Sequence, residues 1–314
     1  SSIIVLRDGW AGTVPELAEI TARADFDEIG IFASQLRGYN GVQWERSLLW
    51  AKGDYVLAVD RLEAEEPGRY DFQCIYRTLG DTELDGRRWV TRKNEARMTL
   101  IAASDAALAQ KQSAGTSLNS KPFPINEARR LIEASGGEMG AGDDYHFANL
   151  FYAEPDDAPE RNLSVMQERD GSYLIRDGGE FAAAGVGYAS VGGLRIDAEA
   201  YHLAGETLHA AGLERLHLGG PMLSAEPPVN ARVDLRTGKA TVIADEPTML
   251  ALGDAAGQEC AVGEHEYTLP TASADRLARV ADTLRMRFAR VAAEDGMDGA
   301  VEAGTGEGIA TLWE

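Results

Sequence analysis

The chain has 314 residues, of which 44% are hydrophobic and 26% are charged, a balance typical of a globular protein with a large core. Acidic residues outnumber basic ones 51 to 30, which gives a net charge of −21. This charge disfavours nucleic acid and anionic membrane surfaces as partners. It also repels acidic polysaccharides at long range unless arginines cluster locally. No apolar run reaches the ~18 residues of a spanning helix, so no membrane span is expected.

The two ends of the chain indicate a part of a longer protein. The first residue is a serine, and residues 1–7 already have the pattern of a strand, with no basic or apolar leader before them. Residues 309–313 end the chain in a new apolar run. We expect a secreted protein, extracellular or periplasmic, whose export signal is not present in this chain. Cys74 and Cys260 form the single possible pair, and we expect buried free thiols rather than a disulfide.

Residues 1–110 are predicted to form a first β-sheet unit, because short strands follow one another with short polar turns. Its clearest part is a hairpin with arms 44–51 and 55–62 around the turn Lys52-Gly53-Asp54. Alternate residues of both arms are apolar on both faces, so the hairpin is expected to lie between two layers. We expect Arg46 and Arg61, on these buried arms, to pair with neighbouring carboxylates.

Residues 111–142 read as a linker, rich in Ala, Gln, Ser and Gly, with a short helix predicted at 125–134. Residues 143–250 are predicted to be a second β-sheet unit of the same sandwich. Strands recur there about every ten residues, with turn signals at 170–171, 192–193 and 237–238.

Residues 251–314 are predicted to hold a C-terminal strand and an amphipathic helix over 272–295, with apolar residues at helical spacing (Leu277, Val280, Leu284, Phe288). The predicted fold class is therefore all-β: an antiparallel stacked-sheet sandwich, or supersandwich, with a short linker helix and a C-terminal helix.

Two stretches carry candidate site residues. Tyr145 and His146 follow two aspartates, an arrangement that could support acid–base catalysis, although neighbours on a strand point to opposite faces. Arg37, Tyr39 and Asn40 lie in a polar, Gly-flanked loop and suit a sugar and its carboxylate, with an ordinary loop as the alternative.

Other site types lack a signature. The spacing of His202, His209 and His217 imposes no shared metal geometry, and the paired aspartates do not follow a calcium-loop pattern. No Gly-rich phosphate loop opens a helix, and no Gly-x-Ser-x-Gly motif is present. We therefore expect no metal and no cofactor.

The hairpin region resembles the C-terminal β-sandwich of heparinase II/III-like polysaccharide lyases. The matching features are Trp44 with Arg46, the turn Lys52-Gly53 before Tyr55, the run 59–61 (VDR) and the acidic turn at 65–68 (EEPG). The resemblance implies stacked antiparallel sheets beside a helical toroid, and β-elimination on uronic-acid glycans by Tyr, His, Asn and Arg side chains.

This chain departs from that family in two respects: it contains no helical toroid, and it lacks the His-rich strand that precedes the family's opening strand. The resemblance therefore implies a β-sandwich portion of a lyase that is inactive without the missing helical domain of the same protein. Its partner would be an acidic polysaccharide or another glycan. The alternative is a non-catalytic carbohydrate-binding or cell-surface β module.

Overall fold

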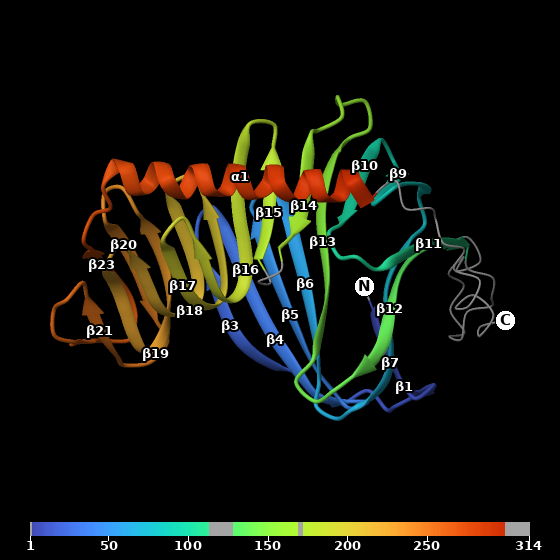
Figure 1. The fold of residues 1–314 in the computed structure, drawn as a ribbon, viewed down its shortest axis with the longest axis horizontal. Helices are drawn as coiled ribbons and strands as arrows, with labels where there is room; N and C mark the ends of the chain where they lie inside the picture. Colours follow the sequence, from blue (N-terminus) through green and yellow to red (C-terminus); the bar gives the residue numbers. More distant parts are fainter. Residues whose placement is uncertain (1, 113–127, 169–171, 299–314) are drawn as a thin grey trace.

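The computed structural model describes residues 2–112, 128–168 and 172–298 (Figure 1). Within these ranges the strands form three antiparallel sheets, and one long helix, α1 (Ala274–Asp298), follows them. No described helix is both long and apolar enough to cross a membrane. The all-β class and the C-terminal helix are thus as predicted from the sequence.

The central sheet has eight strands, in the order β3 (Glu19–Asp25), β4 (Ile29–Tyr39), β5 (Val42–Ala51), β6 (Tyr55–Ala64), β13 (Asp144–Pro155), β10 (Ala96–Ala102), β9 (Arg88–Lys93) and β8 (Asp81–Asp85). The predicted hairpin is confirmed as β5 and β6, in which Ala51 pairs with Tyr55. Gly53 in its turn has φ of +76°, a conformation that glycine adopts without strain.

The five-stranded sheet has the order β11 (Ala107–Gln112), β12 (Arg129–Met139), β7 (Gly68–Thr78), β1 (Ser2–Arg7) and β2 (Trp10–Ala11). The main path of the ten-stranded sheet has the order β14 (Leu163–Gln167), β15 (Ser172–Asp177), β16 (Glu180–Val191), β17 (Leu194–Ala204), β18 (Thr207–Leu218), β19 (Pro221–Asp234), β20 (Lys239–Ala244) and β23 (Gly263–Thr268). Its other two strands lie off this path: β21 (Thr248–Leu252) pairs with β19, and β22 (Gln258–Cys260) pairs with β21. The predicted hairpins β14–β15, β16–β17 and β19–β20 are all confirmed.

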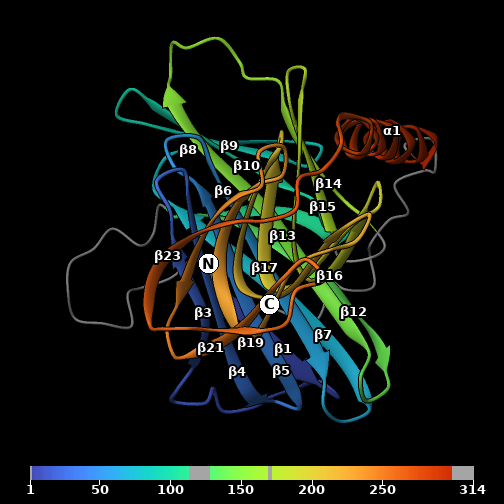
Figure 2. The same ribbon diagram turned by 90° about the vertical axis from the view of Figure 1, so that its left-hand side faces the viewer.

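Both faces of the central sheet are covered, but by different sheets and at different heights. Alternate residues such as Leu49 and Leu57 pack with buried residues of the ten-stranded sheet. The opposite face, including Val42 and Leu62, packs with the five-stranded sheet. The two views show the central strands lying between the other two sheets (Figures 1 and 2). The covering is staggered, so Trp50 near the hairpin tip stays half exposed.

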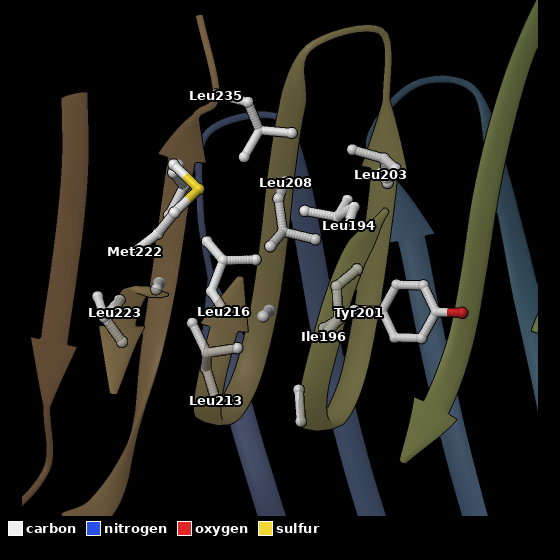
Figure 3. Close-up of a cluster of buried hydrophobic side chains, with 14 of the residues drawn as sticks. Leu194, Ile196, Tyr201, Leu203, Leu208, Leu213, Leu216, Met222, Leu223 and Leu235 are labelled. Carbon is white, nitrogen blue, oxygen red and sulfur yellow. The ribbon is translucent and has the colours of Figure 1, made fainter. Parts of the chain in front are cut away.

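A third apolar cluster fills the other side of the ten-stranded sheet (Figure 3). Helix α1 closes part of this cluster by burying Leu277, Val280, Leu284 and Phe288, the face predicted from their helical spacing. Figure 1 shows the helix running across the ends of β14 to β16. Cys74 and Cys260 are buried free thiols, as expected.

The predicted linker helix is wrong in its described part, because Arg129–Met139 forms strand β12. This strand pairs along its whole length with β7, and it buries Leu131 and Glu133 against the central sheet. The local Ala, Leu and Glu content favours a helix, but pairing with a distant strand overrides that preference. The division of the chain into two units around residues 111–142 stays a prediction. The strand predicted at the C-terminus lies outside the described residues.

A buried ion pair joins the two arms of the hairpin, as predicted for Arg46. Asp60, which is 0% exposed, accepts hydrogen bonds from Arg46 Nε (2.6 Å) and Nη2 (2.9 Å) and from Trp44 Nε1 (2.7 Å). The Arg46 guanidinium also lies 4.9 Å from the Trp44 ring centroid. This cluster fixes the register of β5 against β6 on the face toward the five-stranded sheet.

Replacing Asp60 by Ala leaves a largely buried guanidinium without its counter-charge. We expect the free energy of unfolding to fall by ~3 kcal/mol, measured by urea denaturation. Asp81→Ala, at an exposed position of β8, is the control and should change stability by no more than about 0.5 kcal/mol. Equal effects of the two substitutions would show that the Asp60 cluster does not stabilise the fold.

Candidate functional site

The main cleft of the described structure lies between the central sheet and the ten-stranded sheet and has a volume of about 1580 Å³. Its position follows from the sequence of the hairpin. On one face of β5 and β6, Leu49 and Leu57 belong to the apolar contact between the sheets, whereas Glu45 and Arg61 line the cleft. The same face is therefore apolar near the hairpin tip and polar toward the other end. The cleft begins where these polar side chains replace the apolar ones.

The opposite wall is shaped by β-bulges. Strands β16, β17 and β18 each change register at the level of the cleft, at 186–187, 197–198 and 210–213. Bulges redirect side chains and increase local twist. At Gly212 a Cβ atom would lie 2.6 Å from Glu199 Cγ, so only glycine leaves room for the Glu199 side chain. Asp197, Glu199 and Glu214 of these strands line the cleft.

Arg61 is the centre of an ion network on the central wall. Its guanidinium contacts Glu45 Oε2 (3.2 Å), Glu63 Oε2 (2.6 Å) and Asp144 Oδ2 (2.7 Å). Burial acts to raise the pKa of Asp144, but the hydrogen bond from Arg61 and the nearby His146 hold this pKa below its usual value. The expected ion pairing of Arg61 is thus confirmed, and its cationic charge is already shared among three carboxylates.

His146 lines the cleft and contacts residues of both sheets. Its Nδ1 lies 3.1 Å from the hydroxyl of the fully buried Tyr173, and its Nε2 lies 3.5 Å from Asp144 Oδ2. Burial lowers the pKa of His146, an effect that Asp144 opposes. When the ring is neutral and its Nε2–H points to Asp144, Nδ1 accepts a hydrogen bond from the Tyr173 hydroxyl. Both nitrogens then have partners, and neither is a free base.

Tyr145 lies on the opposite face of β13, as the alternation of a strand requires. It stacks with Phe72 at a centroid distance of 6.2 Å and donates a hydrogen bond to Asp105 Oδ1 at 2.8 Å. Burial raises the pKa of Tyr145, so the phenol stays protonated. The side chain still borders the cleft beside the segment 102–105, which leaves the central sheet for the five-stranded one.

The three predicted substrate-binding residues are separated by the structure. Arg37 borders the cleft, where it is exposed and donates to Gln35 Oε1 at 3.4 Å. Tyr39 is 5% exposed and donates its hydroxyl proton to Ile3 O. Asn40 donates to the carbonyls of Val5 and Trp10. Neither Tyr39 nor Asn40 lines the cleft, so of this set only Arg37 shares it with Tyr145 and His146. The substrate-binding role of Arg37, Tyr39 and Asn40 stays a prediction.

Tyr173 is the partner of His146 that sequence reasoning missed. It lies on β15, in a hairpin that pairs only with other strands of the ten-stranded sheet. A tyrosine in a short apolar strand carries no signal for a distant histidine. Only the stacking of the two sheets brings the two side chains together.

The histidines considered for a metal lie elsewhere. His202 and His209 are buried between the sheets, where His202 Nε2 lies 2.6 Å from the Tyr55 hydroxyl and His209 Nε2 lies 3.3 Å from Glu28 Oε2. His217 is not grouped with them, and no set of three metal-ligand side chains converges in the described residues. Burial lowers the pKa of His202 to about 3, and the neighbouring His209 acts in the same direction.

The depressed pKa of His202 predicts acid sensitivity. In the unfolded chain the His202 imidazole binds a proton at about pH 6.5, whereas in the folded chain it stays neutral until about pH 3. The stability that neutral His202 contributes is therefore fully present above about pH 6.5 and is lost as the pH falls. Compared with His202→Gln, the native protein should lose ~3 kcal/mol more between about pH 7 and about pH 4. Urea denaturation across this range measures the difference, and parallel pH profiles for the two proteins would contradict it.

Glu133 is a second buried titratable group, between the five-stranded and central sheets. It is 0% exposed, and Ser104 donates to its Oε2 at 3.1 Å. Burial raises its pKa to about 7, although Asn149, Ser104 and Arg87 act in the opposite direction. The pKa of Glu133 is higher in the folded chain than in the unfolded chain. Its carboxyl group therefore stabilises the fold fully below about pH 4.5, and this contribution is lost as the pH rises through about 7.

Glu133→Gln removes this buried charge and should raise the free energy of unfolding by ~2 kcal/mol at about pH 8. At about pH 4.5 the two proteins should be nearly equal. The matched control is Glu138→Gln, an exposed position of the same strand, which should show no pH-dependent difference. A gain that does not vary with pH would mean that the Glu133 charge is not its cause.

No family model matches the sequence, and no curated protein matches it. Among solved structures, heparan sulfate lyase HepC from Pedobacter heparinus is similar over 57% of this chain and 29% of its own, with 14% identity and a TM-score of 0.43. A heparinase III structure covers 57% of this chain and 28% of its own, with 10% identity and a TM-score of 0.42. A putative kojibiose phosphorylase from human microbiome has a TM-score of 0.32, with 8% identity, over 50% of this chain and 22% of its own. The chain spans less than a third of the length of these proteins.

Proposed function

We propose that this chain is a carbohydrate-binding β-sandwich portion of a larger lyase-like protein, and that it does not cleave a glycan by itself. The cleft between the central and ten-stranded sheets is the observation that carries this proposal. At about 1580 Å³ it can hold several sugar units, and both walls present hydroxyl, amide and carboxylate groups. We expect it to act outside the cytoplasm, together with a helical domain of the same protein.

The state of the candidate catalytic groups supports binding without chemistry. β-Elimination needs a base free to take a proton and a cation free to neutralise a carboxylate. The Tyr145 phenol is held by Asp105, and the nitrogens of His146 face Tyr173 and Asp144. Arg61 is already shared by three carboxylates. Autonomous lyase activity through Tyr145 and His146 would require these contacts to break.

The sequence resemblance agrees with a scaffold role. Its most specific part, residues 44–68, forms β5, β6 and the following turn at the centre of the middle sheet. The motif residues Arg46 and Asp60 face the five-stranded sheet, where they pair with each other and do not line the cleft. We infer that the motif maintains the stacked sheets, and that the catalytic residues of such a protein come from another domain.

The test combines binding and activity on the chain alone, using short oligomers of neutral, uronate and amino sugars. We expect calorimetric binding of at least one class and no rise in ultraviolet absorbance from unsaturated uronides. Such a rise from this chain by itself would contradict the scaffold role. Absence of binding to every class would contradict the carbohydrate-binding function.

Tyr188 offers a directed test of the cleft. It is 57% exposed, lies at the bulge of β16 and borders the cleft, so its ring can stack on a sugar. Tyr188→Ala should weaken glycan binding about 10-fold. Trp10→Ala, which removes an 80% exposed ring outside the cleft, is the matched control and should leave the affinity unchanged. Loss of affinity only in the Trp10 variant would place the glycan elsewhere.

A further inference from the structure

The charges on the wall of the cleft formed by the ten-stranded sheet are unbalanced. Asp197 and Glu199 on β17 and Glu214 on β18 all line the cleft, and none of them forms an ion pair with a described residue. The carboxylates of Glu45 and Glu214 lie close enough to Glu199 to affect it. Burial raises the pKa of Glu199, and these two neighbours raise it further. Carboxylates from both walls therefore face the same space.

The arginines that border the cleft do not balance this charge. Arg61 is held by Glu45, Glu63 and Asp144. Arg87 donates to the carbonyls of Ala102 and Ala106, at 2.9 and 3.1 Å. Carbonyl oxygens are neutral, so Arg87 keeps its charge, and its Nη2 has no described partner. Arg37 is exposed, and it and Arg87 are the two cations without a carboxylate partner among the described residues that border the cleft, against the three carboxylates of Asp197, Glu199 and Glu214. A uronate glycan would meet more like charge than opposite charge here.

The central wall also offers a side-chain hydroxyl to a ligand. Ser47 is 6% exposed and lines the cleft, and its side chain forms no hydrogen bond with a described residue. It lies between Ala33 and Val59 on the neighbouring strands, whose side chains offer it no partner. Its oxygen is not among the described side-chain atoms that are shut off from solvent without a partner, so it opens to the cleft, where a ligand can bond to it.

We infer that the ligand of this cleft is a glycan that carries protonated amino groups, such as an oligomer of glucosamine with free amines. This inference rests on the proposed carbohydrate-binding function and narrows it to one substrate class. An ammonium group has three donors and no acceptor, so it suits the carboxylates of Glu199 and Glu214, which line the same wall of the cleft. On the opposite wall, the Ser47 hydroxyl can form a hydrogen bond with a substituent of the sugar ring.

The experiment compares oligomers of equal length by calorimetry at mildly acidic pH: glucosamine, N-acetylglucosamine and galacturonate. We expect the glucosamine oligomer to bind at least 10-fold more tightly than its N-acetylated form, because acetylation removes the charge and keeps the backbone. The galacturonate oligomer should bind most weakly. Equal or tighter binding of the acetylated or uronate oligomer would overturn the inference and leave the carbohydrate-binding function standing. Absence of all binding would overturn both.

Substitutions of single glutamates test which carboxylates bind the ammonium group. Glu199→Gln and Glu214→Gln should each weaken glucosamine-oligomer binding about 5- to 10-fold and leave binding of the acetylated oligomer unchanged. Glu264→Gln, at an exposed position of β23 outside the cleft, makes the same change in net charge and should have no effect. Ser47→Ala, which removes an unpartnered hydroxyl, should reduce affinity without lowering the melting temperature. If Glu264→Gln weakened binding equally, the preference for the glucosamine oligomer would come from the net charge of the protein and not from the cleft. This result would contradict the inference.

Discussion

Burial of both faces of the central sheet is the constraint on which the rest of this structure depends. The five-stranded sheet covers one face and the ten-stranded sheet covers the other, but the two covers are displaced along the strands. Apolar residues such as Leu49 and Leu57 hold two sheets together at one end. At the other end the same face carries Glu45 and Arg61, whose charges cannot be buried in an apolar contact. The cleft is therefore a consequence of where the apolar pattern of β5 and β6 stops.

The charged groups of the fold separate into two kinds. Arg46 and Asp60 satisfy each other in the interior, and Arg61 holds the carboxylates on the central wall. These groups stabilise the fold and leave little charge for a ligand. The carboxylates of Glu199 and Glu214 lie on the bulged strands of the opposite wall and have no such counter-charge. This asymmetry favours a ligand that brings its own positive charge.

Local patterns in the sequence were sufficient for the hairpin, the ion pairs of its arginines and the apolar face of helix α1. They failed where long-range pairing decides the structure. Residues 129–134 have a helical composition, yet they form part of β12 because β7 offers a partner along the whole strand. The insertion of β13 between β6 and β10 joins segments far apart in the chain, and no local periodicity reports it. Hence the contact of His146 with Tyr173 could not be predicted, and of the loop residues Arg37, Tyr39 and Asn40 only Arg37 borders the cleft.

The most direct test of the account is hydrogen–deuterium exchange of the whole chain with and without a bound glucosamine oligomer. If the cleft is the binding site, protection should appear together in β5, β6 and β13 on one wall and in β17 and β18 on the other. The strands of the five-stranded sheet should be unchanged. Protection confined to the five-stranded sheet or to helix α1, with none on the two walls, would contradict the account.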